Sequence, residues 1–532
     1  MRSFLLLLLA PLSLLATDTA KPNLIFLITD QQTIEALGCA GNPYLKTPNL
    51  DRLAARGVRF EKSYSTYPLC CPSRASLFTS RTPHQLGVYA NANADIDKKN
   101  VPTMGEVFQA GGYDTAYAGK WHLSAPFPSF KGIKMPGFEV LPLGGDDPHS
   151  VDGSKYGRGL TVDPNTANAA AKFIRQPHTK PFLLVVSILN PHDICEYAEC
   201  EALNNLLPAD KSKLPPARPN IHDSEKVPVA LQKDIAKRSD WSDQKWREYL
   251  YIYYRLTEIA DAEAGRVLKA LDESGLANNT VVVFTSDHGE MMGSHCLVTK
   301  SKLYEESVAV PLIVAGPGVK PAIDRQHLIS GLDMMPTLLD YAGIAAPASV
   351  QGTSIRPLVD GKSPAWRDHV VAEVNSSIEC RMVRTAHYKY LTYAQGENNE
   401  QFFDMEKDML EIHNLIADPS LADEIQRHRS LLAQWRKDTQ DETGKKAPEK
   451  KNARKKTIVA KADSTTAKAP AVDREVAFKN RDKDKDGRLD AAEYIGSQKD
   501  PEGAKRRFER MDTNKDGFLS HDEFTAETPK AK

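Results

Sequence analysis

The sequence predicts an α/β fold with a central sheet, because three apolar runs alternate with helical patterns. The first run, Asn23 to Thr29, is continuously apolar and ends at Asp30, as a buried parallel strand does. Pro181 to Leu189 and Thr280 to Thr285 repeat this design, and residues 241–274 between them carry a long helical periodicity. In open α/β sheets, ligands bind at the carboxyl ends of the strands. We therefore expect the polar residues that follow these runs to form one site.

Length and charge set broad limits on the function. The chain has 532 residues, which is enough for several domains and a large core. Its formal net charge is -1 with 26% charged residues, so it offers no broad basic field for nucleic acid. Nucleic acid is therefore not expected as a partner.

The N-terminus has the charged, apolar and small-residue order of a secretory signal peptide. Arg2 precedes an apolar stretch from Phe4 to Leu15, and small residues follow at Ala16 and Ala20. We expect residues 1–20 to be a signal peptide and the mature protein to be periplasmic or secreted. An uncleaved N-terminal anchor is the alternative. No later segment reaches the roughly 20 apolar residues of a transmembrane helix, so no integral membrane segment is expected after signal removal.

The cysteine count points to one thiol with a special role. Seven cysteines stand at positions 39, 70, 71, 195, 200, 296 and 380, and an odd number cannot all pair within an exported chain. Cys70 is the candidate for that role. Cys195 and Cys200 are close enough to form a small disulfide loop, and two free thiols are the alternative, because sequence does not determine connectivity.

Beyond about residue 345 the pattern changes to shorter elements. Residues 346–440, with several tyrosines near position 390 and a helical stretch from Leu421 to Lys437, predict a small α+β subdomain. Residues 441–472 are rich in Lys, Ala, Thr and Pro, which predicts a disordered basic linker. Its cluster from Lys450 to Lys456 is interpreted as solvated, with contact to polyanions as the alternative.

Residues 473–526 predict an all-α EF-hand pair that binds two Ca²⁺ ions. Two twelve-residue runs place oxygen donors at the ligand positions and glycine at the sharp turn, as at Gly487. We expect these loops to stiffen the C-terminus at extracellular calcium levels and not to act as sensors. The predicted ligands, with backbone carbonyls at the seventh positions, are Asp482, Asp484, Asp486, Arg488, Asp490 and Glu493 in the first loop and Asp512, Asn514, Asp516, Phe518, Ser520 and Glu523 in the second.

The most informative motif is the run from Cys70 to Arg81, which begins Cys-Cys-Pro-Ser-Arg. It resembles the signature of the sulfatase family. In that family a maturation enzyme oxidises the first cysteine to formylglycine, whose aldehyde hydrate attacks the sulfur of a sulfate ester. Pro72 also suits the first turn of a helix through Arg81, which would place Cys70 just ahead of a helix N-terminus that favours an anion.

The resemblance covers roughly residues 21–415 and implies the alkaline-phosphatase-like fold. That fold has a large mixed central sheet sandwiched by helices, here in a catalytic domain over residues 21–345. The family's metal ligands map onto Asp30, Gln31, Cys70, Asp287 and His288, and its metal is usually Ca²⁺. Carboxylate and amide oxygens suit such a hard cation, and the imidazole also admits Mn²⁺ or another divalent ion.

The resemblance also implies the residues that carry the reaction. Lys120 would clamp the sulfate, and His122 would remove a proton from the sulfated hydrate, a role that a near-neutral pKa suits. His192 and Lys300 match the pair that contacts the substrate and would protonate the leaving group, with Lys302 as the alternative lysine. Arg74 would position the formylglycine hydrate through charge-assisted hydrogen bonds.

Three departures from the common family pattern bear on the activity. Ser80 replaces a glycine, which could affect recognition by the maturation enzyme. Gln31 replaces an aspartate and His288 an asparagine, so the metal site has one formal negative charge fewer. The predicted function is an exported sulfatase acting on sulfated small molecules or glycans. One alternative is a formylglycine-dependent phosphonate or phosphate diester hydrolase, and another is a non-catalytic, calcium-dependent surface-binding protein.

Overall fold

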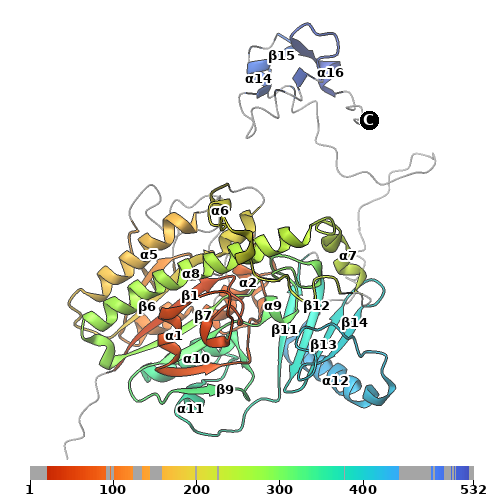
Figure 1. Cartoon of the computed structure of the whole chain (residues 1–532). Helices are drawn as coiled ribbons and strands as arrows, with labels where there is room; N and C mark the ends of the chain where they lie inside the picture. The colour runs from red at the N-terminus through yellow and green to blue at the C-terminus, as the bar shows by residue number, and fades with distance from the viewer. Residues whose placement is uncertain are drawn as a thin grey trace, which may run out of the picture. The chain divides into compact units, whose positions relative to one another are not determined.

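The structure is a computed structural model that describes residues 21–91, 96, 101–123, 135–143, 158–197, 201–223, 227–376, 378–442 and parts of 478–525. The chain divides into two units, Met1–Lys446 and Ala447–Lys532, which are described separately (Figure 1). The predicted signal peptide and nearly all of the predicted linker lie outside the described residues. Within the described part of the chain, no helix is long and apolar enough to cross a membrane.

A mixed eight-stranded sheet forms the centre of the first unit. Its strands, in spatial order, are β5 (Glu139–Val140), β4 (Asp114–Gly119), β6 (Phe182–Pro191), β1 (Asn23–Asp30), β7 (Thr280–Ser286), β8 (Leu312–Ala315), β2 (Gly57–Phe60) and β9 (Ala322–Asp324). The three predicted apolar runs are β1, β6 and β7, which lie side by side in parallel and are buried throughout. β8 runs antiparallel to both β7 and β2, which makes the sheet mixed.

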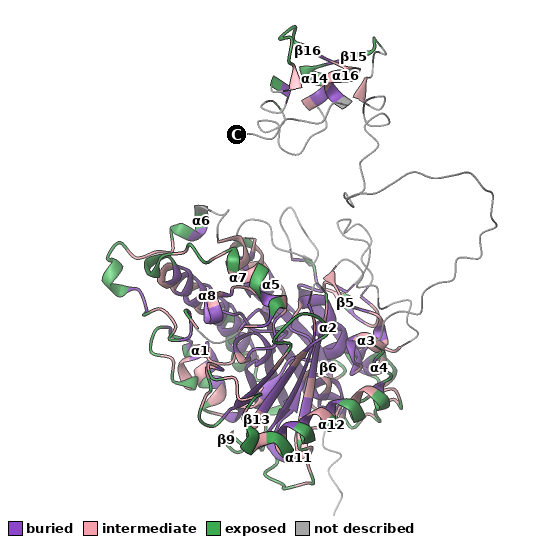
Figure 2. Cartoon of the chain, turned by 90° about the vertical axis from the view of Figure 1, so that its right-hand side faces the viewer, coloured by how far each residue is buried: buried purple, intermediate pink, exposed green. Residues whose placement is uncertain are grey.

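Helices cover both faces of this sheet, and two apolar clusters fill the space between them (Figure 2). Side chains of β1 alternate between the clusters, with Phe26 in the first and Leu27 in the second. Helices α2 (Cys70–Thr79), α3 (Pro83–Leu86), α4 (Met104–Ala110), α10 (Met334–Ala342) and α11 (Arg356–Val359) contribute to the first cluster. Helices α1 (Pro48–Ala54), α5 (Gly159–Ile174) and α8 (Asp243–Glu273) contribute to the second. The predicted helix–sheet–helix sandwich is confirmed.

Helix α2 is shorter than predicted and begins at Cys70 itself, with Leu69 as its extended N-cap. It ends at Thr79 because Ser80 adopts a left-handed conformation, with φ of 53°, a region that favours glycine. The Ser80 hydroxyl donates to the Leu332 carbonyl at 2.6 Å and accepts from the Gly352 amide at 2.9 Å. The serine therefore keeps the glycine-like turn and adds two hydrogen bonds of its own.

The predicted α+β subdomain is a four-stranded antiparallel sheet with one helix packed on it. The strands are β11 (His369–Asn375), β12 (Glu379–Thr385), β13 (Tyr388–Tyr393) and β14 (Glu400–Asp404), in that spatial order. Helix α12 (Ala422–Thr439) packs against one face through Ile425 and Leu432. The other face joins a cluster that includes Tyr64 and Tyr304 of the catalytic domain, as well as residues near α7 (Val229–Ala236) and α9 (Glu305–Val308).

A buried histidine ties this subdomain to the catalytic domain. His84 of α3 places Nδ1 at 3.0 Å from Glu373 Oε2 in β11 and Nε2 at 3.0 Å from the Thr439 carbonyl. Both partners can only accept, so both ring nitrogens donate and His84 is an imidazolium. Burial opposes this charge, but the hydrogen bond to Glu373 outweighs burial and raises the pKa of His84 above its ordinary value.

The second unit has a short antiparallel pair of strands in addition to helices. β15 (Arg488–Asp490) pairs with β16 (Phe518–Ser520), and α14 (Ala491–Ile495) and α16 (His521–Thr525) follow the two strands. Gly487 and Gly517 have φ of 82° and 85°, as the sharp turns of both loops require. The prediction of an all-α unit is corrected by this strand pair, which brings the two loops side by side.

Candidate active site

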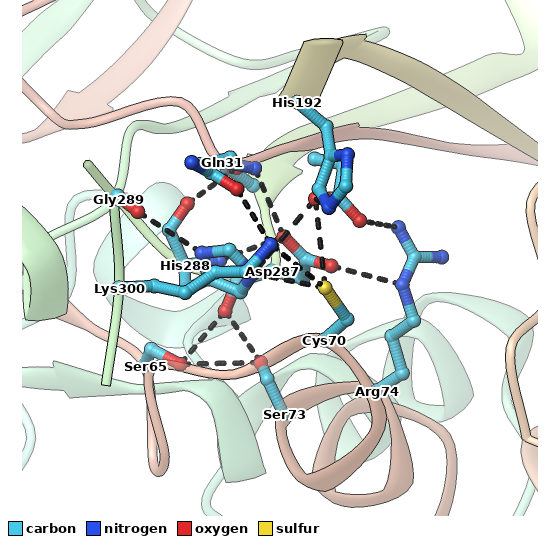
Figure 3. A network of polar contacts seen from close by, with 12 residues as sticks. Gln31, Ser65, Cys70, Ser73, Arg74, His192, Asp287, His288, Gly289 and Lys300 are labelled. Carbon is cyan, nitrogen blue, oxygen red and sulfur yellow. Dashed lines mark hydrogen bonds and ion pairs between the residues drawn. The ribbon is translucent and has the colours of Figure 1, made fainter. Parts of the chain in front are cut away.

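The site lies at the carboxyl ends of the central strands, facing the first turn of α2 (Figure 3). Asp30 ends β1, Lys120 follows β4, His192 follows β6, and Asp287 and His288 follow β7. Parallel strands deliver their ends to one edge of a sheet, so residues that are far apart in sequence meet here.

Cys70 is at the centre of the site and is fully buried. Its Sγ lies 3.3 Å from Lys300 Nζ, 3.3 Å from His288 Nε2 and 3.7 Å from Asp30 Oδ1. Burial alone would raise the pKa of the thiol, but the Lys120 and Lys300 ammonium groups outweigh it and hold the pKa of Cys70 well below its usual value. The predicted formylglycine hydrate would place an oxygen where the thiol sulfur lies.

Four of the five predicted metal ligands form one buried cluster. Ligand atoms of Asp30, Cys70, Asp287 and His288 all lie within 4.8 Å of one another. Burial and the neighbouring Asp30 carboxylate raise the pKa of Asp287 to about 7. Two buried carboxylates this close together are a donor set that fits a divalent cation, which would relieve their repulsion. The fifth residue, Gln31, borders the cluster and directs its Oε1 to Lys300 Nζ at 2.6 Å.

Arg74 hydrogen-bonds both carboxylates of this cluster. It contacts Asp287 Oδ2 through Nε at 2.9 Å and Asp30 Oδ2 through a terminal nitrogen at 3.1 Å. Its other terminal nitrogen donates to the Lys120 carbonyl and to the Ser187 hydroxyl, each at 2.8 Å. We predicted that Arg74 would position the nucleophile, and in the structure its hydrogen bonds orient two predicted metal ligands.

The two predicted lysines hold positive charge on either side of Cys70. Lys120 Nζ lies 2.7 Å from Asp30 Oδ2, and the Asp30 and Cys70 charges raise the pKa of Lys120 despite its burial. The pKa of Lys300 is raised as well, against its burial, by Cys195, Cys70 and Asp30. Lys302 instead pairs with Asp234 Oδ2 at 2.9 Å, so of the two candidate lysines it is Lys300 that reaches the thiol.

The two predicted histidines also border Cys70, but neither has a near-neutral pKa. Burial, aided by Lys120, lowers the pKa of His122 to about 4, although a hydrogen bond with Cys70 opposes this shift. Burial and the charges of Lys300 and Lys120 lower the pKa of His192 to about 3. The expectation of a near-neutral pKa at His122 is therefore wrong, because the site is buried and rich in ammonium groups. Both imidazoles are neutral at physiological pH and can accept a proton.

Two polar residues complete the site although they were not predicted. Ser187 is a single hydroxyl residue within the apolar strand β6, and that interruption was the one available signal for its contact with Arg74. Glu290 is fully buried, two residues beyond His288, and receives a hydrogen bond from Gln31 Nε2 at 2.5 Å. Cys195, which the sequence left either paired with Cys200 or free, is a free thiol and lies beside Gln31. Cys200 lies outside the described residues.

The second unit brings predicted calcium ligands together in both loops. In the first loop, ligand oxygens of Asp482, Asp484 and Glu493 lie within 4.8 Å of one another. In the second loop, Asp512 Oδ2 accepts from the Gly517 amide at 3.0 Å, and Glu523 accepts from the Asn514 amide at 3.3 Å. These contacts draw the first and last ligand positions of the loop toward its centre.

A sheet that gathers a buried nucleophile, two cationic side chains and a carboxylate cluster at its strand ends belongs to a metal-assisted ester hydrolase. The comparisons with known proteins identify the family. The description "Sulfatase" matches residues 22–344, and "N-sulphoglucosamine sulphohydrolase, C-terminal" matches residues 293–438. The chain belongs to the sulfatase family and is a sulfuric ester hydrolase. The description "EF hand" matches residues 505–526, which cover the second loop.

Individual relatives agree with this assignment. The chain is 33% identical to a Delta 4,5-hexuronate-2-O-sulfatase of Bacteroides thetaiotaomicron, over 77% of this chain and 88% of that protein. It is 30% identical to an ulvan-active sulfatase of Formosa agariphila, over 76% and 78% of the two chains. The solved structure of a 2-O GAG sulfatase superposes with a TM-score of 0.69 at 30% identity, and the match covers 79% of this chain and 93% of that one.

Proposed function

We propose that this sulfatase acts outside the cytoplasm on sulfated glycans, with Cys70 converted to formylglycine. The observation that carries the proposal is the position of Cys70, buried at the first turn of α2 within 3.3 Å of Lys300 and His288. A helix N-terminus and two ammonium groups favour an anion, so a sulfate group fits against this residue. The signal-peptide pattern of residues 1–20 supports export.

The side chains around Cys70 suggest a division of roles. Formylglycine at position 70 supplies a hydrated aldehyde as nucleophile, and a divalent cation supplies charge for binding the sulfate oxygens. Asp30, Asp287, His288 and Gln31 would hold that cation, and Arg74 orients its two carboxylates. Lys120 binds a sulfate oxygen from one side of the nucleophile.

Proton transfer follows from the pKa shifts of the same residues. His122 is neutral, because burial lowers its pKa to about 4, and it accepts the proton that must leave the hydrate after sulfate transfer. Lys300 is charged, since the pKa of its ammonium group is raised, whereas the pKa of His192 is about 3. We therefore assign protonation of the leaving alcohol to Lys300, which already carries the proton before substrate binds, and His192 hydrogen-bonds the leaving oxygen beside it.

The glycan substrate is supported by relatives whose names specify carbohydrate sulfates. The test is a panel of sulfated mono-, oligo- and polysaccharides, which includes 2-O-sulfated unsaturated uronic acids, assayed with formylglycine-bearing protein. Free sulfate is measured by ion chromatography, with Cys70→Ala as the control. Release of sulfate from small aryl sulfates alone, with every carbohydrate untouched, would refute the glycan assignment.

A second candidate activity is the hydrolysis of phosphonate or phosphate diesters. Gln31 and His288 favour it, because a metal site with less negative charge is suited to a more highly charged ester. The buried Glu290 carboxylate beside Gln31 weakens this argument, since it returns a negative charge close to the cluster. Turnover of an aryl sulfate is compared with that of a phosphodiester and a phosphonate ester, and a dominant phosphoester activity would overturn the sulfate assignment.

The third possibility, a non-catalytic binding protein, receives no support from the assembled site.

For the second unit we propose that each EF-hand loop binds one Ca²⁺ ion and that both ions stabilise its fold. The carboxylates gathered in the first loop and the paired strands between the loops support this role. Mass spectrometry of protein from the culture supernatant or periplasm, with the N-terminus sequenced, tests export.

A further inference from the structure

Glu290 makes an unusually complete set of hydrogen bonds for a residue outside the predicted site. Its Oε1 accepts from the Tyr249 hydroxyl at 2.8 Å, the Met292 amide at 3.2 Å and the Thr299 amide at 2.5 Å. Its Oε2 accepts from Gln31 Nε2 at 2.5 Å. Three donors hold one oxygen in place, so the other oxygen is aimed at Gln31 and cannot turn away.

The side-chain amide of Gln31 is thereby held in one of its two orientations. A carboxylate oxygen can only accept, so the end of the amide that faces Glu290 is the NH₂ group. An ammonium group can only donate, so the end that faces Lys300 Nζ at 2.6 Å is the oxygen. Cys195 Sγ lies 3.2 Å from one amide atom and 3.3 Å from the other, so it does not select between the two orientations.

We propose that Glu290 is a positioning residue that keeps the Gln31 oxygen turned toward the catalytic metal and Lys300. An amide oxygen has two lone pairs, so Oε1 can serve a cation and Lys300 together, whereas the NH₂ group would repel both. The inference rests on the proposed function of the cluster as a metal site. It also explains how this chain accommodates glutamine at position 31, where aspartate is common. The carboxylate that the aspartate would supply is replaced by that of Glu290, which lies behind Gln31 and hydrogen-bonds its amide.

The substitution Glu290→Gln tests this role by reversing the orientation of the amide. The three donors at Oε1 would hold the new carbonyl oxygen, which leaves the new NH₂ group facing Gln31. Gln31 would then turn its oxygen away from the metal. We expect the affinity of the catalytic site for Ca²⁺ to fall about 10- to 100-fold, as is common when the partner of a metal ligand is lost.

A charge swap separates orientation from simple structural support. The double variant Gln31→Glu with Glu290→Gln keeps the net charge and the hydrogen bond but exchanges donor and acceptor, so an oxygen again faces the metal. We expect it to bind Ca²⁺ within about threefold of the parent, a strong non-additivity for neighbouring residues. Tyr249→Phe is the matched control, because it removes a donor to Glu290 without touching Oε2, and it should also stay within about threefold.

Calcium alone is the ligand, titrated calorimetrically into the full-length metal-free chain. All arms carry Glu493→Gln and Glu523→Gln to remove the EF-hand sites, and thermal unfolding confirms that each variant is folded. If the single variant Glu290→Gln does not fold, the double variant is compared with the single variant Gln31→Glu instead. Gln31→Glu should bind Ca²⁺ more weakly than the double variant. Equal affinity of Glu290→Gln and the parent, a swap as weak as Glu290→Gln, or a Tyr249→Phe variant equally weakened would overturn the proposal. A parent that binds no Ca²⁺ in this background would refute the metal site itself.

Discussion

Replacing Lys300 with alanine should reduce turnover of a sulfate ester about 10²- to 10³-fold. Lys300 Nζ lies 3.3 Å from the Cys70 sulfur, which marks the position of the nucleophile. Two unit charges at that separation interact by about 5 kcal/mol at an effective dielectric constant of about 20. The rate depends only on how much this interaction energy increases from the ground state to the transition state. Loss of one preorganised donor of this kind raises the activation free energy by about 2.7–4 kcal/mol.

Lys302→Ala is the matched control, because its ammonium group pairs with the partly exposed Asp234 at 2.9 Å. Because Lys302 pairs with Asp234 whereas Lys300 contacts Cys70, kcat of Lys302→Ala should change by no more than a few fold. The assay is release of sulfate under saturating substrate, with formylglycine occupancy measured for every variant so that rates refer to matured protein. Lys300→Ala with more than about a tenth of parental kcat, or Lys302→Ala with an equal loss, would refute the assignment of Lys300.

Three further predictions concern the nucleophile, the domain junction and the EF-hands. Cys70→Ala should lower turnover by about 10⁴-fold or more while the fold persists, and mass spectrometry of the parental peptide should show an aldehyde in place of the thiol; an unmodified thiol in active protein would contradict the nucleophile. His84 has a raised pKa, so its stabilisation is present below the unfolded value of about 6.5 and is lost as pH rises through the folded pKa. His84→Gln should therefore lower the thermal midpoint more at about pH 5.5 than at about pH 8.5, and an equal gap at both would contradict the imidazolium. Glu493→Gln with Glu523→Gln should remove two bound Ca²⁺ ions per chain in calorimetry, and unchanged stoichiometry would exclude the loops as calcium sites.

The elements that carry the site were predictable because their signals are local. The runs that became β1, β6 and β7 are mostly apolar and buried throughout, and each ends in a polar group that parallel packing brings to one edge. The motif that begins at Cys70 and the EF-hand spacing are equally local. Within the described residues, the predicted and observed bounds of these strands and of α8 differ by two residues or fewer.

The remaining features depend on contacts between distant segments. Gln31 and Glu290 are 259 positions apart, so no local pattern could reveal that one orients the other. Arg74 was expected at the nucleophile, and only the folded arrangement of β1 and β7 shows that it bridges two carboxylates. The low pKa of His122 arises from burial and a nearby ammonium group, neither of which can be read from the residue type.

Every residue of α2, from Cys70 to Thr79, is buried in the folded protein. If Cys70 is converted to formylglycine as we propose, the enzyme that oxidises it must bind the chain around the thiol, and the folded protein exposes no residue of α2. Under this proposal, oxidation has to precede the folding of this segment, and a chain that folds first keeps its thiol and stays inactive. The yield of active protein would then depend on how soon the nascent segment meets the maturation enzyme.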